Sequence, residues 1–105
     1  MATLCDVRCS PNGVLLELSF VPDSGSSGPG SLSGRVRGPG DLAFSSAFTP
    51  LDPDGAPLRS DGSGFGFDKA REGPDRWVLA MVADGDSDVS SWYSADEGKT
   101  WTRFS

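Results

Sequence analysis

The fold is decided by the stretch Ser94-Ala95-Asp96-Glu97-Gly98-Lys99-Thr100-Trp101, which lies between two strand-like runs near the carboxyl end. An Asp two residues before a Gly can close a turn, because its carboxylate accepts backbone N–H groups while the Gly takes a left-handed conformation. We expect Trp101 to anchor the returning strand. The stretch therefore predicts a hairpin, and it describes local fold chemistry rather than a reaction.

The spacing in this stretch resembles the Asp box, or BNR repeat, of sialidases, sortilin-type receptors and other β-propellers, which also occurs singly in some small secreted ribonucleases. The resemblance covers 8 of 105 residues and includes all five defining positions, which are Ser94, Asp96, Gly98, Thr100 and Trp101. It implies that the motif lies on the hairpin joining the third and fourth strands of a blade. In that family the box is mostly structural and lies away from the catalytic centre, so the resemblance predicts topology better than activity.

Length and composition indicate a single β domain covering residues 1–105. Only 36% of the residues are hydrophobic, and the chain contains 14 Gly and 8 Pro, which is typical of a loop-rich β protein. The net charge of −6 repels phosphate backbones and anionic membrane surfaces, so we expect neither nucleic acid nor a membrane as a partner.

The amino-terminal residues and the hydropathy pattern bear on the compartment. No run approaches the roughly 18 apolar residues that a membrane helix needs, so we expect no membrane insertion. The start of the chain lacks the basic and apolar segments of a secretory signal. As written, the sequence predicts a cytoplasmic protein, or a secreted one if a signal has been removed.

The amino-terminal half contains one clear strand signal. Residues 14–21 alternate between two faces, which predicts a half-buried strand. Residues 22–40 are rich in Gly, Pro and Ser and predict a partly flexible loop, interrupted at most by a short strand at 33–37. Residues 41–48 regain enough apolar content to predict another strand.

A second loop-rich stretch, residues 49–75, precedes the best-specified part of the chain. Within it, Phe65 and Phe67 mark a short strand, and residues 68–72 are the only plausible helical turn. Residues 76–83 are apolar on both faces, which predicts a strand buried on both sides. Residues 89–94 and 100–104 complete three consecutive antiparallel strands around the predicted hairpin.

These elements predict an all-β fold: a small antiparallel sandwich or barrel-like sheet with a C-terminal three-stranded meander that carries the Asp-box hairpin. A closed propeller takes about four or more four-stranded blades, and this chain has material for two at most. We favour the sandwich. A fragment that completes its sheet by self-association is the alternative.

Catalytic residues are not indicated by the sequence. The chain has no His, so it has no Ser-His-Asp or Cys-His system. Ribonucleases with an Asp box generally pair a Glu with a His, and sialidases use three arginines with a Tyr–Glu pair and an Asp acid. Tyr93 is the only Tyr and no Arg-Ile-Pro motif is present, so no catalytic residue carries over. We expect a protein that is not an enzyme.

Two clusters could bind metal or form a disulfide. Asp84, Asp86 and Asp88 resemble the first half of a calcium loop, because alternate oxygen ligands can converge on one hard cation. The second half of that loop is missing, so a Ca²⁺ site and a solvated acidic loop both remain open. Cys5 and Cys9 could form a small disulfide loop or stay as two thiols.

Trp92 and Tyr93 are the candidate interface residues. As neighbours in a strand they point to opposite faces, so one of them should be less buried than the other. Exposed aromatic side chains can stack on sugars or anchor a protein interface. The ring that faces outward is therefore the best interface candidate, while the other belongs to the aromatic core.

The sequence as a whole favours a non-catalytic binding or assembly module. We expect it to engage a protein partner through a sheet surface or edge and through acidic loops, or to self-associate. The Asp-box resemblance supports an alternative, a carbohydrate-binding module or a sialidase-like glycosidase remnant that binds a glycan. A calcium-dependent binder is a further alternative.

Overall fold

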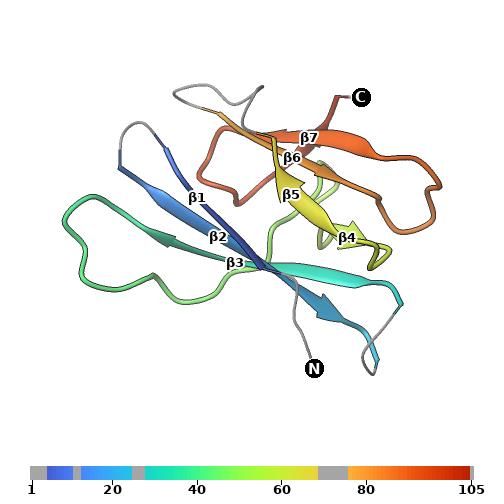
Figure 1. The fold of residues 1–105 in the computed structure, drawn as a ribbon, viewed down its shortest axis with the longest axis horizontal. Helices are drawn as coiled ribbons and strands as arrows, with labels where there is room; N and C mark the ends of the chain where they lie inside the picture. Colours follow the sequence, from blue (N-terminus) through green and yellow to red (C-terminus); the bar gives the residue numbers. More distant parts are fainter. Residues whose placement is uncertain (1–4, 11–12, 25–27, 69–75, 105) are drawn as a thin grey trace.

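Two four-stranded antiparallel sheets make up the protein in the computed structural model, which describes residues 5–10, 13–24, 28–68 and 76–104. The strand order is β1-β2-β3-β4 in the first sheet and β5-β6-β7-β8 in the second, and Figure 1 shows the second sheet above the first. The described residues include no helix. The predicted all-β class is confirmed.

The first sheet is a meander of β1 (Cys5–Cys9), β2 (Leu15–Pro22), β3 (Gly30–Arg37) and β4 (Arg59–Ser60). Strand β2 is the one predicted at residues 14–21. Its alternate side chains Leu16, Leu18 and Phe20 are buried, as the sequence pattern requires.

Strand β3 is longer than the sequence indicated, because it pairs with β2 along all eight of its residues. Two of its inward positions are glycines that packing requires. A Cβ at Gly30 would collide with the carbonyl oxygen of Val21, and one at Gly34 would lie 2.8 Å from the ring of Phe48. These glycines serve close approach of chains rather than flexibility. The short strand expected at 33–37 is confirmed, whereas the flexible loop expected over 22–40 is wrong for residues 30–32, which belong to the same strand.

The strand predicted at residues 41–48 is wrong. This segment runs beside β3 but forms only one isolated bridge there, between Phe48 and Gly34. Nearer the other end, the Val36 N–H donates to Ser45 Oγ at 3.1 Å, while the Ser45 N–H donates to the Val36 carbonyl at 2.7 Å. A side-chain oxygen thus takes the place of a backbone carbonyl, and the ladder does not continue.

The second sheet consists of β5 (Phe65–Phe67), β6 (Trp77–Met81), β7 (Ser90–Ser94) and β8 (Thr102–Arg103). All four strands lie where the sequence predicted them, and β5 extends the expected three-stranded meander to four strands. Val78 is fully buried, as are its strand neighbours Leu79 and Met81 at 0–2% exposure, so β6 is buried on both faces. The predicted helical turn at 68–72 falls largely on residues outside the described ranges.

The core lies between the two sheets. The first sheet contributes the inward side chains of β2 and β3, and the second contributes those of β5, β6 and β7. Its members are Leu16, Leu18, Phe20, Leu32, Leu58, Phe67, Trp77, Leu79, Met81, Trp92 and Trp101. Burial of these large apolar surfaces is the main force that holds the sheets together.

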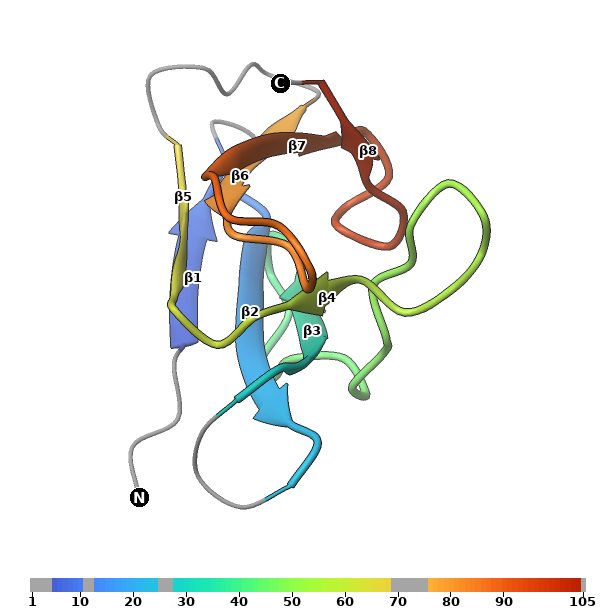
Figure 2. The same ribbon diagram turned by 90° about the vertical axis from the view of Figure 1, so that its right-hand side faces the viewer.

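The sheets are also joined along both sides, as Figure 2 lets the reader follow. On one side, Asp6 of β1 accepts the backbone N–H of Phe67 in β5 at 3.0 Å. On the other, the Leu51 N–H donates to the Lys99 carbonyl at 2.9 Å, and the Trp101 N–H donates to the Leu51 carbonyl at 2.8 Å. These bonds link β1 to β5 and link the segment around Leu51 to the residues that precede β8, and they give the sandwich a barrel-like character.

Candidate functional site

The turn between β7 and β8 is closed by the carboxylate of Asp96. Its Oδ1 accepts the Ser94 hydroxyl at 2.8 Å and the Thr100 N–H at 2.9 Å, and its Oδ2 accepts the Thr100 hydroxyl. Burial by itself raises the pKa of Asp96, but the hydrogen bonds from Thr100, Ser94 and Lys99 outweigh it and hold the pKa below its usual range. The carboxylate is therefore engaged by its own turn.

The same turn packs against the opposite sheet. Glu97 and Gly98 both have left-handed backbones, with φ of 63° and 87°. Gly98 faces Leu16 of β2, and its N–H donates to Ser94 Oγ at 2.9 Å. Trp101 is fully buried, and its Nε1–H donates to the Gly98 carbonyl at 2.7 Å. All of these contacts are internal, so the turn serves as a structural connection between the sheets.

This hairpin joins the third and fourth strands of its sheet. That is the location which the Asp-box resemblance implies. The resemblance itself stays a prediction, because the geometry describes one turn and not a family.

Two of the three predicted calcium ligands pair with arginines in the structure. Asp84 accepts Arg59 at 3.0 Å, and Asp86 accepts Arg103. No group of three or more His, Cys, Asp or Glu side chains in the described ranges is placed to hold a metal ion. The structure therefore does not bring Asp84, Asp86 and Asp88 together as ligands, and calcium binding stays an alternative for a titration to test.

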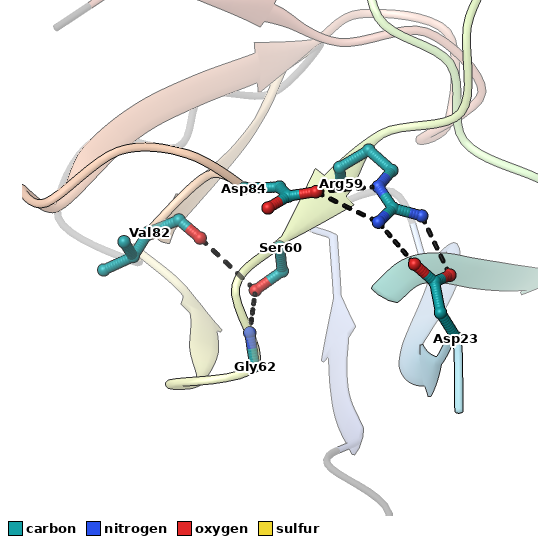
Figure 3. A network of polar contacts seen from close by, with 6 residues as sticks. All are labelled: Asp23, Arg59, Ser60, Gly62, Val82 and Asp84. Atoms are coloured by element: carbon teal, nitrogen blue, oxygen red, sulfur yellow. Dashed lines mark hydrogen bonds and ion pairs between the residues drawn. The ribbon is translucent and has the colours of Figure 1, made fainter. Parts of the chain in front are cut away.

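Arg59 connects three strand ends, as Figure 3 shows. Its Nη atoms donate to both carboxylate oxygens of Asp23 at 2.9 and 2.6 Å, and Asp84 accepts from its other side. Asp23 follows β2, whereas Asp84 follows β6, so the guanidinium links the first sheet to the second. The hydrogen bond from Arg59 lowers the pKa of Asp23, and the two carboxylates raise the pKa of Arg59.

Ser60 lies next to this ion pair and is fully buried. Its hydroxyl donates to the Val82 carbonyl at 3.4 Å and accepts the Gly62 N–H at 3.3 Å (Figure 3). The Asp61 N–H donates to the same carbonyl at 3.0 Å. These bonds hold the chain after β4 to the end of β6, which is a structural role.

The two candidate interface residues point in opposite directions. Trp92 is only 9% exposed, and its Nε1–H donates to Ser90 Oγ at 3.0 Å within the core. Tyr93 is half-buried on the outer face of the second sheet. Of the two rings, Tyr93 is thus the one that a partner could contact.

Two further residues gather around Tyr93. The ring of Phe104, which is 43% exposed, meets it edge to face with centroids 5.6 Å apart. The Arg76 guanidinium lies 6.0 Å from the centroid of the Tyr93 ring. We call Arg76, Tyr93 and Phe104 the Tyr93 cluster. Sequence reasoning named neither Arg76 nor Phe104, although alternation along 102–104 places Phe104 on the same face as Thr102, the partner of Tyr93.

The cysteines lie on an extended strand. Cys9 is an exposed free thiol. Strand geometry separates the Cα atoms of positions 5 and 9 by about 13 Å, whereas a disulfide needs them within about 7 Å. A bridge between the two would require β1 to come apart, so the strand favours the thiol interpretation.

No protein-family model, curated protein or solved structure matches this chain. Across the described ranges, no helix has the length and apolar character needed to cross a membrane. The Tyr93 cluster, with its partly exposed aromatic rings, is the candidate site.

Proposed function

We propose that this protein is a non-catalytic binding module that engages a protein partner through the outer face of its second sheet. The observation that carries the proposal is the Tyr93 cluster, in which two partly exposed aromatic rings and a guanidinium lie together on β7 and beside the ends of its two neighbouring strands. Tyr, Phe and Arg are enriched at protein interfaces, and Tyr and Arg are prominent among the residues that dominate binding energy.

The support under the cluster makes it a suitable binding surface. Tyr93 lies in β7, which pairs with β6 on one side and β8 on the other. A ring held on a paired strand loses little conformational entropy when a partner covers it. Because β7 is an inner strand whose backbone is paired on both sides, the proposal uses the sheet surface rather than an edge.

The charge of the chain indicates the kind of partner. Net charge is −6, and the loops at residues 52–55 and 84–88 carry two exposed carboxylates, Asp54 and Asp88, that form no ion pair among the described residues. A partner whose rim is basic would be attracted and oriented by this field. We therefore propose that the partner contacts the Tyr93 cluster with an apolar centre and the acidic loops with basic side chains.

A non-catalytic role agrees with how the carboxylates are used. Asp96 is engaged by its own turn, while Asp23, Asp84 and Asp86 accept arginines. Among the described residues, the pKa values of Asp23 and Asp96 are lowered, and these structural hydrogen bonds are the cause. The chain also has no His to act as a base near neutral pH.

The proposal is tested by co-purification from the native source with three baits: the unmodified protein, Tyr93→Ser and Val21→Ser. Val21 is the control, because it is an apolar residue on the solvent side of the first sheet, at 48% exposure, and lies on a different sheet from Tyr93. We expect the unmodified protein and Val21→Ser to retain the same partner and Tyr93→Ser to lose it. Retention by Tyr93→Ser of a partner that binds the unmodified protein directly would contradict the proposed site.

A glycan ligand is the alternative that the same cluster must be tested against, since an exposed Tyr ring can stack on a sugar. A glycan array distinguishes a glycan ligand from a protein partner. Binding that Tyr93→Ser abolishes and Val21→Ser leaves intact would favour the carbohydrate-binding alternative over a protein partner.

A further inference from the structure

Strand β1 turns charged side chains toward the interior of the sandwich. Asp6 and Arg8 lie opposite Leu18 and Leu16 of β2, which are fully buried, so all four share the inner face of the sheet. Asp6 and Arg8 are half-buried, and none of the described side chains of β1, at residues 6–9, belongs to the core. The strand therefore lacks the apolar burial that holds β2 and β6 in place.

The inward side chains of β1 meet the second sheet at Phe67. Strands β1 and β5 are the first strands of their sheets and lie side by side, as Figure 2 shows. Their backbones form no ladder in the ranges that the structure describes. Instead, Asp6 Oδ2 accepts the Phe67 N–H at 3.0 Å, and the Arg8 guanidinium carbon lies 6.0 Å from the centroid of the Phe67 ring. We call this contact the β1–β5 seam.

The ladder that joins β1 to β2 is weaker than the ladder on the other side of β2. It has five residue pairs, whereas β2 and β3 form eight. The pairing of β2 with β3 also places two core residues, Phe20 and Leu32, opposite each other. The inward pairs of β1 each set a charged side chain against a leucine, and such a pair gains less than an apolar one.

We propose that β1 is a strap, held closed by the bond from the Phe67 N–H to Asp6, that opens as a unit ahead of global unfolding. Segments with few buried apolar contacts open at a lower free energy than the core strands of the same protein. In the opened form β2 stays paired with β3, while the other side of β2 and the ring of Phe67 become accessible. This device goes beyond the proposed function, and the β1–β5 seam shares no residue with the Tyr93 cluster.

The inference is tested by hydrogen exchange of backbone amides, followed by NMR, in the unmodified protein and three variants. Asp6→Ala removes the acceptor of the Phe67 N–H. Asp54→Ala is the matched control, because it removes one exposed carboxylate from the loop at residues 52–55. Leu58→Ala leaves a cavity beside β4, at the opposite edge of the first sheet from β1. Circular dichroism checks that each variant is folded.

In the unmodified protein we expect the protected amides of β1 to have protection factors at least tenfold lower than those of β6 and β7. Low concentrations of urea should change the protection of β1 only slightly, because opening the strap exposes little surface, and should lower that of β6 and β7 steeply. This measurement needs no variant. Equal protection of β1, β6 and β7 with the same dependence on urea would overturn the inference.

The variants separate a strap from a strand that opens only with the whole protein. Asp6→Ala should lower the protection of the β1 amides about tenfold, and Asp54→Ala should leave it unchanged. Leu58→Ala should lower the protection of β6 and β7 at least tenfold while that of β1 stays the same. An effect of Asp6→Ala on the Phe67 amide alone, or an equal fall in β1, β6 and β7 in Leu58→Ala, would overturn the inference.

Discussion

Gly98 in the β7–β8 turn lies directly against Leu16 in β2. A Cβ at position 98 would come within 2.8 Å of both methyl carbons of Leu16, and the Gly98 backbone has a φ of 87°. A turn in the second sheet thus fills the inner face of the first at a point where only glycine fits. The hairpin is a means of fixing the two sheets to each other.

Replacing Gly98 tests this contact. We expect Gly98→Ala to lower the free energy of unfolding by about 2–4 kcal/mol, because backbone strain and overpacking against Leu16 both act. Gly55→Ala is the matched control, since Gly55 has a similar φ of 83° with nothing within 4 Å of the added Cβ. Gly55→Ala should lower the free energy of unfolding by about 1–2 kcal/mol, from backbone strain alone. Urea denaturation measures both, and equal losses would contradict the packing argument.

Removing the charge of Asp96 should destabilise the turn. We expect Asp96→Asn to lower the free energy of unfolding by about 1–3 kcal/mol, since an amide accepts the Ser94 and Thr100 donors less strongly. Glu97→Gln, which neutralises the adjacent exposed carboxylate, should have little effect. An equal effect of the two changes would indicate that overall charge and not the turn is responsible.

The same carboxylate predicts a pH dependence. Its folded pKa lies below the unfolded value, so its contribution to stability is present above the unfolded pKa of about 3.9 and is lost as the pH falls through the folded pKa. Acid denaturation followed by circular dichroism should therefore show a smaller loss of stability between pH 5 and pH 2, roughly, in Asp96→Asn than in the unmodified protein. An equal loss of stability in the two proteins would contradict the assignment of this pH dependence to Asp96.

Replacing Arg59 should lower the Tm by an amount that depends on salt. Because its ion pairs with Asp23 and Asp84 are exposed, we expect Arg59→Gln to lower the Tm by a small amount at low ionic strength. The difference should shrink at about 1 M NaCl, where screening acts over roughly 3 Å. Lys99→Gln controls for the change in net charge. A large, salt-independent loss would mean that the side chain acts through packing.

Calcium provides a test of the acidic loop. Since Asp84 and Asp86 accept arginines, an ion would have to displace these partners. We expect millimolar Ca²⁺ to leave the Tm unchanged. A shift that disappears in Asp86→Ala would contradict this expectation and favour the calcium-dependent binder.

Local sequence patterns predicted the strands with clear periodicity. Alternation from residue 14 to residue 21 located β2, and the apolar run at 76–83 located β6, since both patterns are local. Strand β3 was underestimated because its glycines and serines carry no hydropathy signal, and its ladder with β2 is decided by pairing along the whole strand.

The candidate site was predictable only in part. Adjacent aromatic residues in a strand indicated that one ring faces outward, but not that Phe104 and Arg76 would join Tyr93. The ion pairs of Arg59 could not be predicted from the sequence, because Arg59 is 36 residues from Asp23 and 25 from Asp84 in the chain. Such contacts depend on how the sheets pack, which no short pattern encodes.

We propose that Asp96 builds the scaffold while Tyr93 contacts the partner. The most direct measurement is the affinity of the co-purified partner for Asp96→Asn and Tyr93→Ser, at a temperature where both variants are folded. We predict that Asp96→Asn binds like the unmodified protein despite its lower stability, whereas Tyr93→Ser loses binding at unchanged fold. A folded Asp96→Asn that fails to bind, together with a Tyr93→Ser that binds normally, would contradict the account.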